Sequence, residues 1–154
     1  MINTFPEYNC KPSLIEFMID KTINLNRDDY PTIEPDGEKI WYNSEGKFHR
    51  LDGPARIFPN GRKEYWVDGK MHRDDGPAII YADGSEFYCK NGKLHREDGP
   101  AVMDEDGYRA YYQDDKLHRL DGPAQTFPDG REYYFQDGIL EYWNTGILEK
   151  ELND

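Results

Sequence analysis

The stretch His49-Arg50-Leu51-Asp52-Gly53-Pro54-Ala55 recurs three more times along the chain, and this recurrence decides the fold. The later copies begin at His72, His95 and His118, so the period is 23 residues with no insertion between copies. Chance does not produce four such copies at one fixed spacing, and a period of roughly 20–50 residues is typical of repeat architectures. The sequence therefore predicts a tandem array of one small structural unit.

Each unit contains two turn signals. The first is Pro59-Asn60-Gly61 and its counterparts, and the second is Asp68-Gly69 and its counterparts. Asn-Gly and Asp-Gly between β-prone residues are strong hairpin signals, because glycine accepts a positive φ. The residues between the turns are β-branched or aromatic, so each unit is predicted to form two short antiparallel strands. The glycines of the first turn are expected to have positive φ; they are Gly61, Gly84, Gly107 and Gly130.

The aromatic residues are predicted to divide between the two faces of the sheet. A three-residue turn at 59–61 places Ala55 beside Tyr65, which predicts an Ala/Tyr ladder on one face. The other face would then collect Phe58, Trp66, Tyr81, Phe87, Tyr112, Phe127, Tyr133 and Phe135. A two-residue turn would exchange these two sets. Tyrosines recur at one position of the repeat, which we call the Tyr column: Tyr42, Tyr65, Tyr88, Tyr111 and Tyr134. In the partial first unit, one extra residue compared with the full units is expected before Tyr42.

The two ends of the chain differ from the repeats. Residues 1–30 are predicted to be an N-terminal cap with one amphipathic helix at about 13–24, since Ser13-Leu14-Ile15-Glu16 is a capping-box pattern. Residues 31–140 are the repeat array, and residues 141–154 are predicted to be a C-terminal cap and tail. The predicted fold class is mainly β, an elongated, twisted antiparallel meander of 23-residue hairpin repeats with a short N-terminal helix.

Composition limits the partners and the location. The net charge is −12, from 31 acidic and 19 basic residues, which disfavours general binding to nucleic acid or anionic membrane and is compatible with a basic protein partner. There is no run of about 18 apolar residues for a membrane span, and residues 1–7 have no signal-peptide pattern. The two cysteines do not form a disulfide framework. These features predict a cytoplasmic protein. They leave open whether it forms a homo-oligomer.

The segment Lys90-Asn91-Gly92-Lys93-Leu94-His95, together with the Asp-Gly pair of the preceding unit, resembles the MORN repeat over roughly residues 31–140. The chain departs from that pattern where His-Arg-x-Asp-Gly-Pro-Ala replaces a His-Gly-x-Gly step. It is similar in this respect to variant repeats of bacteriophage and bacterial proteins. The resemblance implies a single elongated antiparallel sheet that serves as an interaction scaffold.

The His-Arg pairs are the candidate binding residues. One interpretation is structural: each Arg pairs with the Asp two residues later or with the Asp of the next unit, and each His caps a turn or stacks beside its neighbour. The other is a cationic rim, joined by the Lys column (Lys47, Lys70, Lys93, Lys116), on which an anionic ligand of nucleotide size binds and its base stacks on Tyr. The residues assigned to that rim are His49, Arg50, His72, Arg73, His95, Arg96, His118, Arg119, Tyr65, Tyr88 and Tyr111.

Chemistry at these residues is not expected. Equivalent His residues in successive units stand about 9.6 Å apart, because each unit adds two strands of about 4.8 Å; zinc ligands must converge within about 2.3 Å of one point. We therefore predict no metal, no cofactor and no enzymatic activity. The leading functional hypothesis is a protein-interaction module, which a phage would use to inhibit a host defence protein. The alternatives are a sponge for a small anionic nucleotide signal and an acidic mimic of nucleic acid.

Overall fold

The computed structural model describes residues 30–145, which form a succession of short antiparallel strands. These residues contain 17 strands. In chain order they are β1 (Thr32–Ile33), β2 (Lys39–Ile40), β3 (Arg56–Ile57), β4 (Lys63–Glu64), β5 (Trp66–Val67), β6 (Lys70–Met71), β7 (Ile79–Ile80), β8 (Glu86–Phe87), β9 (Cys89–Lys90), β10 (Lys93–Leu94), β11 (Val102–Met103), β12 (Arg109–Ala110), β13 (Tyr112–Gln113), β14 (Lys116–Leu117), β15 (Gln125–Thr126), β16 (Glu132–Gln136) and β17 (Ile139–Asn144).

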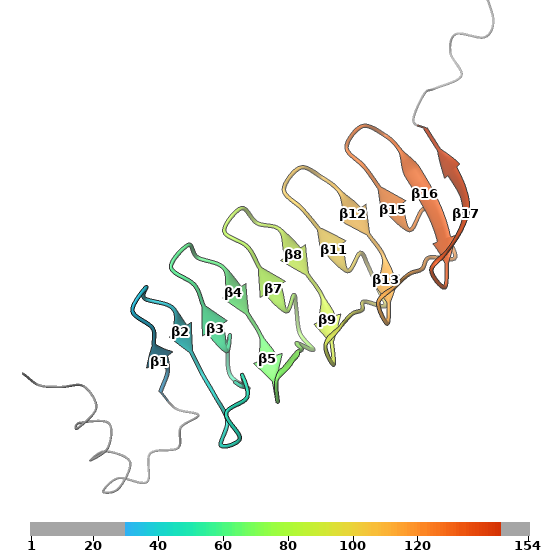
Figure 1. Cartoon of the computed structure of the whole chain (residues 1–154). Coiled ribbons are helices and arrows are strands. Elements are labelled where there is room, and N and C mark those ends of the chain that lie inside the picture. Colours follow the sequence, from blue (N-terminus) through green and yellow to red (C-terminus); the bar gives the residue numbers. More distant parts are fainter. Residues whose placement is uncertain (1–29, 146–154) are drawn as a thin grey trace, which may run out of the picture.

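Eleven strands form one open sheet in the order β1-β2-β3-β4-β7-β8-β11-β12-β15-β16-β17, with the first strand of each unit paired to the last main-sheet strand of the unit before. Figure 1 shows this sheet as an elongated row of similar hairpins. The predicted mainly β antiparallel meander of hairpin repeats is confirmed. The main sheet takes two strands from each repeat, as predicted, but a second small hairpin that was not predicted follows them in three repeats: β5–β6, β9–β10 and β13–β14.

The first turn of each unit has the predicted three-residue form. In the first full unit, the Phe58 amide donates to the Arg62 carbonyl at 2.9 Å, and the Gly61 amide donates to the Phe58 carbonyl at 3.0 Å. Pro59 begins this turn because its ring presets φ for the first central position. The prediction of positive φ at the closing glycines is confirmed: 89° at Gly61, 94° at Gly84, 98° at Gly107 and 87° at Gly130.

The second turn of each unit is a two-residue turn with both residues in the left-handed region. Asp68 and Gly69 have φ values of 49° and 76°, and the other units show the same pattern. Such turns match the right-handed twist of the strands that they join. The Gly69 amide donates to the Phe48 carbonyl of the preceding unit at 2.9 Å, so these small hairpins are hydrogen-bonded to one another along the array.

The incomplete unit before the first full one differs from the predicted register. Trp41, not Tyr42, occupies the position of the Tyr column, because the Trp41 amide donates to the Ala55 carbonyl at 2.8 Å, as the later tyrosines do to their alanines. The extra residue therefore lies after this position, in the turn at residues 43–47, where Gly46 has a φ of 74°.

The two faces of the sheet carry different side chains. One, which we call the aromatic face, contains rings whose neighbouring centroids lie 5.0–5.5 Å apart; these are Phe48, Trp66, Tyr81, Phe87, Tyr108, Phe127 and Tyr133. The opposite face carries Tyr65, Tyr88 and Tyr111. The alanines of the repeat have no exposed surface and form the most buried column of the array; they are Ala55, Ala78, Ala101 and Ala124.

A polar cluster replaces apolar packing in the first full unit. Glu64 is only 1% exposed and accepts hydrogen bonds from Trp66 Nε1 at 2.9 Å and from Arg56 Nη1 at 3.3 Å. Arg62 also pairs with the Glu64 carboxylate, and Arg56 pairs with Glu38 at 2.7 Å. In the second unit, the positions of Arg56 and Glu64 are occupied by Ile and Phe, so this cluster belongs to one unit alone.

The last strands are longer than the rest. β16 and β17 form a hairpin with a register shift after Tyr134, and β17 runs across the predicted boundary between residues 140 and 141. The predicted helix at about 13–24 lies outside the described residues, as does the end of the predicted C-terminal tail. Among residues 30–145, no helix has the length and apolar character needed to cross a bilayer.

Candidate functional site

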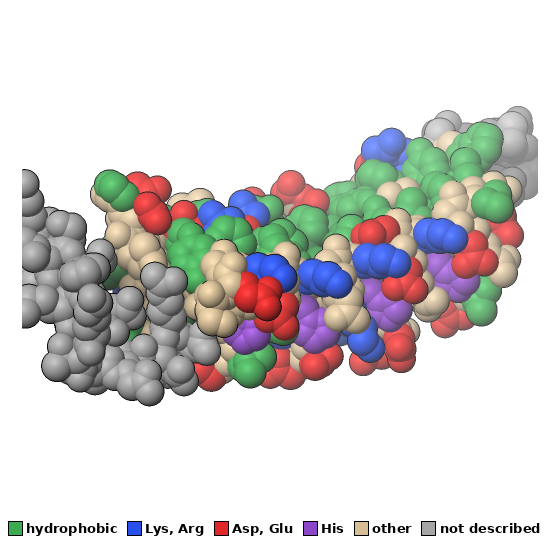
Figure 2. Space-filling model, turned by 60° about the horizontal axis from the view of Figure 1, so that its bottom comes forward, with side chains coloured by type: hydrophobic (Ala, Val, Ile, Leu, Met, Phe, Trp, Pro, Cys, Tyr) green, Lys and Arg blue, Asp and Glu red, His purple; other side chains and the backbone are tan. Residues whose placement is uncertain are grey.

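The four His-Arg-x-Asp-Gly-Pro-Ala segments lie along one side of the array and together form what we call the rim. The rim consists of residues 49–55, 72–78, 95–101 and 118–124. Figure 2 shows its histidines in a row along the molecule, with cationic and acidic side chains beside them. The structure therefore brings the sequence-predicted His and Arg residues to one surface, at one set per unit.

Each rim arginine lies flat on an aromatic ring. The Arg73 guanidinium carbon is 4.1 Å from the centre of the Tyr65 ring, and the other three arginines are 3.9–4.1 Å from theirs. Arg73 Nε donates to Asp75 at 2.8 Å and Nη1 donates to the Pro77 carbonyl at 3.3 Å. The same contacts recur in all four units. The Arg–Asp pair of the structural interpretation is therefore confirmed, while a ligand-binding role stays a prediction.

The glycine of the rim segment makes room for this arginine. A Cβ on Gly76 would lie 3.0 Å from the Arg73 guanidinium carbon, and at Gly99 the corresponding distance to Arg96 is 2.9 Å. Neither glycine has a positive φ, so close approach explains their presence rather than backbone conformation. This role was not predicted from the sequence, although the glycine present in all four copies indicated it.

Each rim histidine accepts a hydrogen bond from the backbone of the second turn that follows it in the chain. His72 Nδ1 accepts a hydrogen bond from the Asn91 amide at 3.1 Å, and the other three make the same contact 19 residues ahead. Each His therefore caps the second turn that follows it in the chain, which is one of the two roles that the structural interpretation predicted. The ring is oriented by this contact, with Nε2 of His72 3.4 Å from the Asp74 carboxylate.

The carboxylates of the rim face outward. Side chains at the third and fourth positions of the segment are 79–88% exposed where they are acidic, whereas the arginines are 23–27% exposed. The hydrogen bond from the neighbouring arginine holds the pKa of Asp52, Asp75 and Asp121 below its ordinary value. The outer surface of the rim is therefore acidic, and the predicted cationic character belongs to its inner layer.

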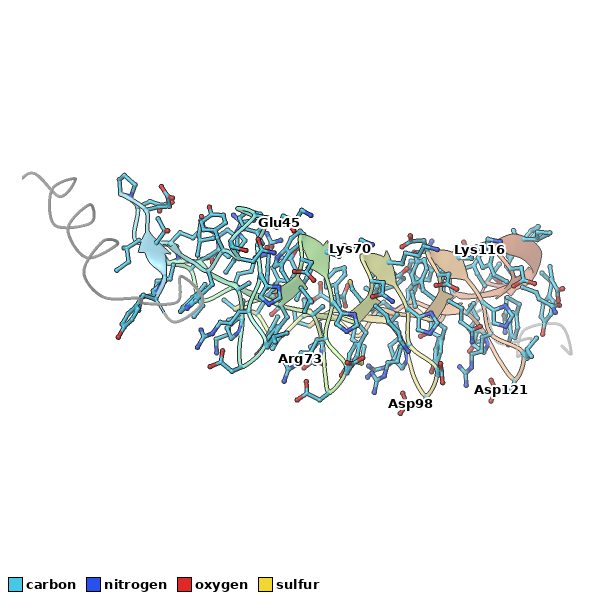
Figure 3. The ribbon with its side chains drawn as sticks, turned by 90° about the horizontal axis from the view of Figure 1, so that it is seen from below. Glu45, Lys70, Arg73, Asp98, Lys116 and Asp121 are labelled. Atoms are coloured by element: carbon cyan, nitrogen blue, oxygen red, sulfur yellow. The ribbon has the colours of Figure 1, made fainter. Side chains whose placement is uncertain are left out.

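The lysine column does not join the rim arginines. Lys70 packs over Gly92 of the next unit's second turn, where a Cβ would meet the lysine Cβ at 3.7 Å. In Figure 3, Lys70 and Lys116 lie on the opposite side of the array from Arg73, Asp98 and Asp121. The prediction that the Lys column and the rim arginines form one cationic surface is therefore wrong. Each lysine comes directly after the second turn, and each arginine comes three residues later in the chain, on the other side of the array.

A hollow of 510 Å³ lies between the first two rim segments. Its lining includes two arginines and three carboxylates, together with His72 and the apolar residues Leu51 and Val67. The three carboxylates are those of Asp52, Asp74 and Asp75. Negative charges therefore outnumber the arginine charges around this hollow. Among residues 30–145, no group of three or more His, Cys, Asp or Glu side chains is placed to hold a metal ion.

Replacing Gly99 with alanine is expected to lower the free energy of unfolding by about 1 kcal/mol, because the Arg96 guanidinium must leave the Tyr88 ring. The measurement is urea denaturation of Gly99→Ala, Arg96→Ala and the double variant. With Arg96 already removed, the glycine substitution should cost almost nothing. An equal cost in both backgrounds would show that the arginine is not the reason for the glycine.

No family model matches this chain, and no curated protein matches it.

Proposed function

We propose that the chain is a non-catalytic repeat protein, MORN-like in organisation, that binds a protein partner along the rim. The observation that supports this most is the repeated orientation of the rim: arginines are held inward on tyrosine rings while carboxylates are 79–88% exposed. The same surface recurs in every unit, which suits a partner that makes several equivalent contacts. Inhibition of a host defence protein by a phage-borne copy is one specific form of this proposal.

The charge distribution favours a partner with basic groups over a small anion. An anion in the hollow between the first two segments would approach Asp52, Asp74 and Asp75, which outnumber the two arginines there. Two of the three nitrogens of each rim guanidinium are also engaged, by Asp and by a Pro carbonyl. A basic side chain meets exposed, ionised carboxylates instead, and such complementarity steers association and sets specificity.

The second candidate is sequestration of a small anionic nucleotide signal. It is favoured by one observation, that the hydrogen bonds from the Arg73 guanidinium to Asp75 and to the Pro77 carbonyl use Nε and Nη1 and not Nη2. Mimicry of nucleic acid is less favoured by the spacing. Rim segments recur about every 9.6 Å, whereas duplex DNA carries one negative charge per about 1.7 Å.

Affinity capture with matched variants tests the proposal. The rim variant is Asp74→Lys with Glu97→Lys, since neither carboxylate is bonded to a rim arginine; the aromatic-face variant is Tyr81→Ser, and its control on the opposite face is Ile80→Ser. We expect one stoichiometric protein to be retained by the wild type and by both face variants and lost with the rim variant. A melting-temperature screen with nucleotides runs in parallel.

The outcomes are distinct. Retention lost only in Tyr81→Ser would keep protein binding but move the site to the aromatic face. Nucleotide-induced stabilisation that disappears in Arg73→Ala would support the second candidate instead. Retention that is equal for all variants, with no nucleotide response, would contradict the rim as a binding surface.

A further inference from the structure

The third residue of each rim segment follows a pattern that the fold itself does not require. This third position, which we call the tip, is leucine in the first and last segments and acidic in the two inner ones: Leu51, Asp74, Glu97 and Leu120. Leu51 is 80% exposed and Leu120 is 76% exposed, and the two acidic tips are as open to solvent. The rim therefore presents two apolar tips on either side of two carboxylates.

The segments fold alike whichever residue is at the tip. The arginine–ring, arginine–aspartate and arginine–carbonyl contacts are present in all four segments, with leucine, aspartate or glutamate between them. Turn formation therefore does not select the tip residue. A single exposed leucine is ordinary, but two at equivalent positions, one at each end of the row, define a pattern that a partner can recognise.

The spacing of the tips matches an extended chain. Successive tips are about 9.6 Å apart, since each unit adds two strands to the sheet. In the extended polyproline II conformation three residues cover about 9.3 Å and bring the side chain back to the same side, so every third residue faces the rim. Seven residues of a helix cover about 10.5 Å and would be out of step by almost 3 Å over three units. An extended segment of about ten residues therefore spans all four tips.

We propose that the rim binds one extended, basic protein segment with two cationic side chains at its centre and an apolar side chain at each end. This rests on the proposed function and specifies its partner. The cations meet Asp74 and Glu97, and beside Asp74 the hydrogen bond from Arg73 holds the pKa of Asp75 below its ordinary value. At the first end, the apolar side chain packs on Leu51 and enters the 510 Å³ hollow, which Val67 and Tyr65 also line.

A synthetic peptide provides the probe. It has ten residues, leucine at both ends, lysine at its fourth and seventh positions and serine elsewhere, and carries a fluorophore for anisotropy. A second peptide has glutamate in place of both lysines, and a third has serine in place of both leucines. The full chain is tested as wild type, as Asp74→Lys with Glu97→Lys, and as Leu51→Ser with Leu120→Ser.

We expect the lysine peptide to bind the wild type and to lose at least tenfold in affinity on the charge-reversed variant, which should instead prefer the glutamate peptide. The lysine peptide should bind the leucine variant severalfold more weakly than the wild type, and the peptide without leucines should bind the wild type severalfold more weakly. The peptide without leucines should lose little further affinity on the leucine variant. Melting temperatures of the variants should stay close to that of the wild type, because the leucine segments fold alike without the His72–Asp74 and His95–Glu97 contacts.

This inference would be overturned if the lysine peptide did not bind the wild type. It would also be overturned if the charge-reversed variant did not change its preference from the lysine peptide to the glutamate peptide. If a captured protein is then still lost with the rim variant, the proposed function stands and only the chemistry of its partner is wrong. If neither peptide nor protein depends on the rim, both fail together.

Discussion

Replacement of Glu64 by alanine is expected to lower the free energy of unfolding by about 2–3 kcal/mol. Glu64 is 1% exposed and its carboxylate holds Arg56, Arg62 and the Trp66 indole together. Without it, the indole N–H loses its acceptor, and Arg62 loses the carboxylate with which it is paired. The arginines keep partial contact with water, so the loss is placed below the roughly 3–5 kcal/mol of a broken, fully buried ion pair. Urea denaturation followed by tryptophan fluorescence measures it.

The repeat itself supplies the control for this substitution. The residue equivalent to Glu64 in the third unit is Ala110, which has no exposed surface, so alanine fits the backbone at this position. The double variant Arg56→Ile with Glu64→Phe reproduces the Ile79–Phe87 pair of the second unit. It should recover at least half of the stability lost in Glu64→Ala. A loss below about 0.5 kcal/mol in Glu64→Ala would contradict the structural importance of the cluster.

Replacement of Gly84 by valine is expected to cost about 1–3 kcal/mol through backbone strain alone. Gly84 has a φ of 94°, and a Cβ built on it meets no atom within 4 Å, so no steric clash adds to the effect. A β-branched side chain is strongly disfavoured in this region, whereas asparagine adopts it more readily. Gly84→Asn should therefore cost less than half as much as Gly84→Val. Equal unfolding midpoints for the wild type and the valine variant would contradict the turn assignment.

Contacts between residues close in the chain were open to prediction from the sequence. The Arg50–Asp52 pair joins residues two apart, and the Pro59-Asn60-Gly61 turn involves five consecutive residues, so residue types and spacing indicate both. The single-residue displacement at Trp41 was not predicted, because the extra residue could be placed in either neighbouring turn without changing the pattern. The hydrogen bond from Trp41 to Ala55 and the position of Arg50 over the Trp41 ring distinguish the two positions.

The sequence alone determined the 23-residue period, the two turns of each unit, the glycines with positive φ and the antiparallel meander, since all of these follow from local conformational preference and repetition. Only the tertiary structure decided the character of the rim. The direction of Arg73 depends on a tyrosine ring eight residues earlier and on the absence of a Cβ at Gly76, which become neighbours when the small hairpin closes. That packing turns the positive charge inward and leaves the carboxylates at the surface, which composition and spacing do not specify.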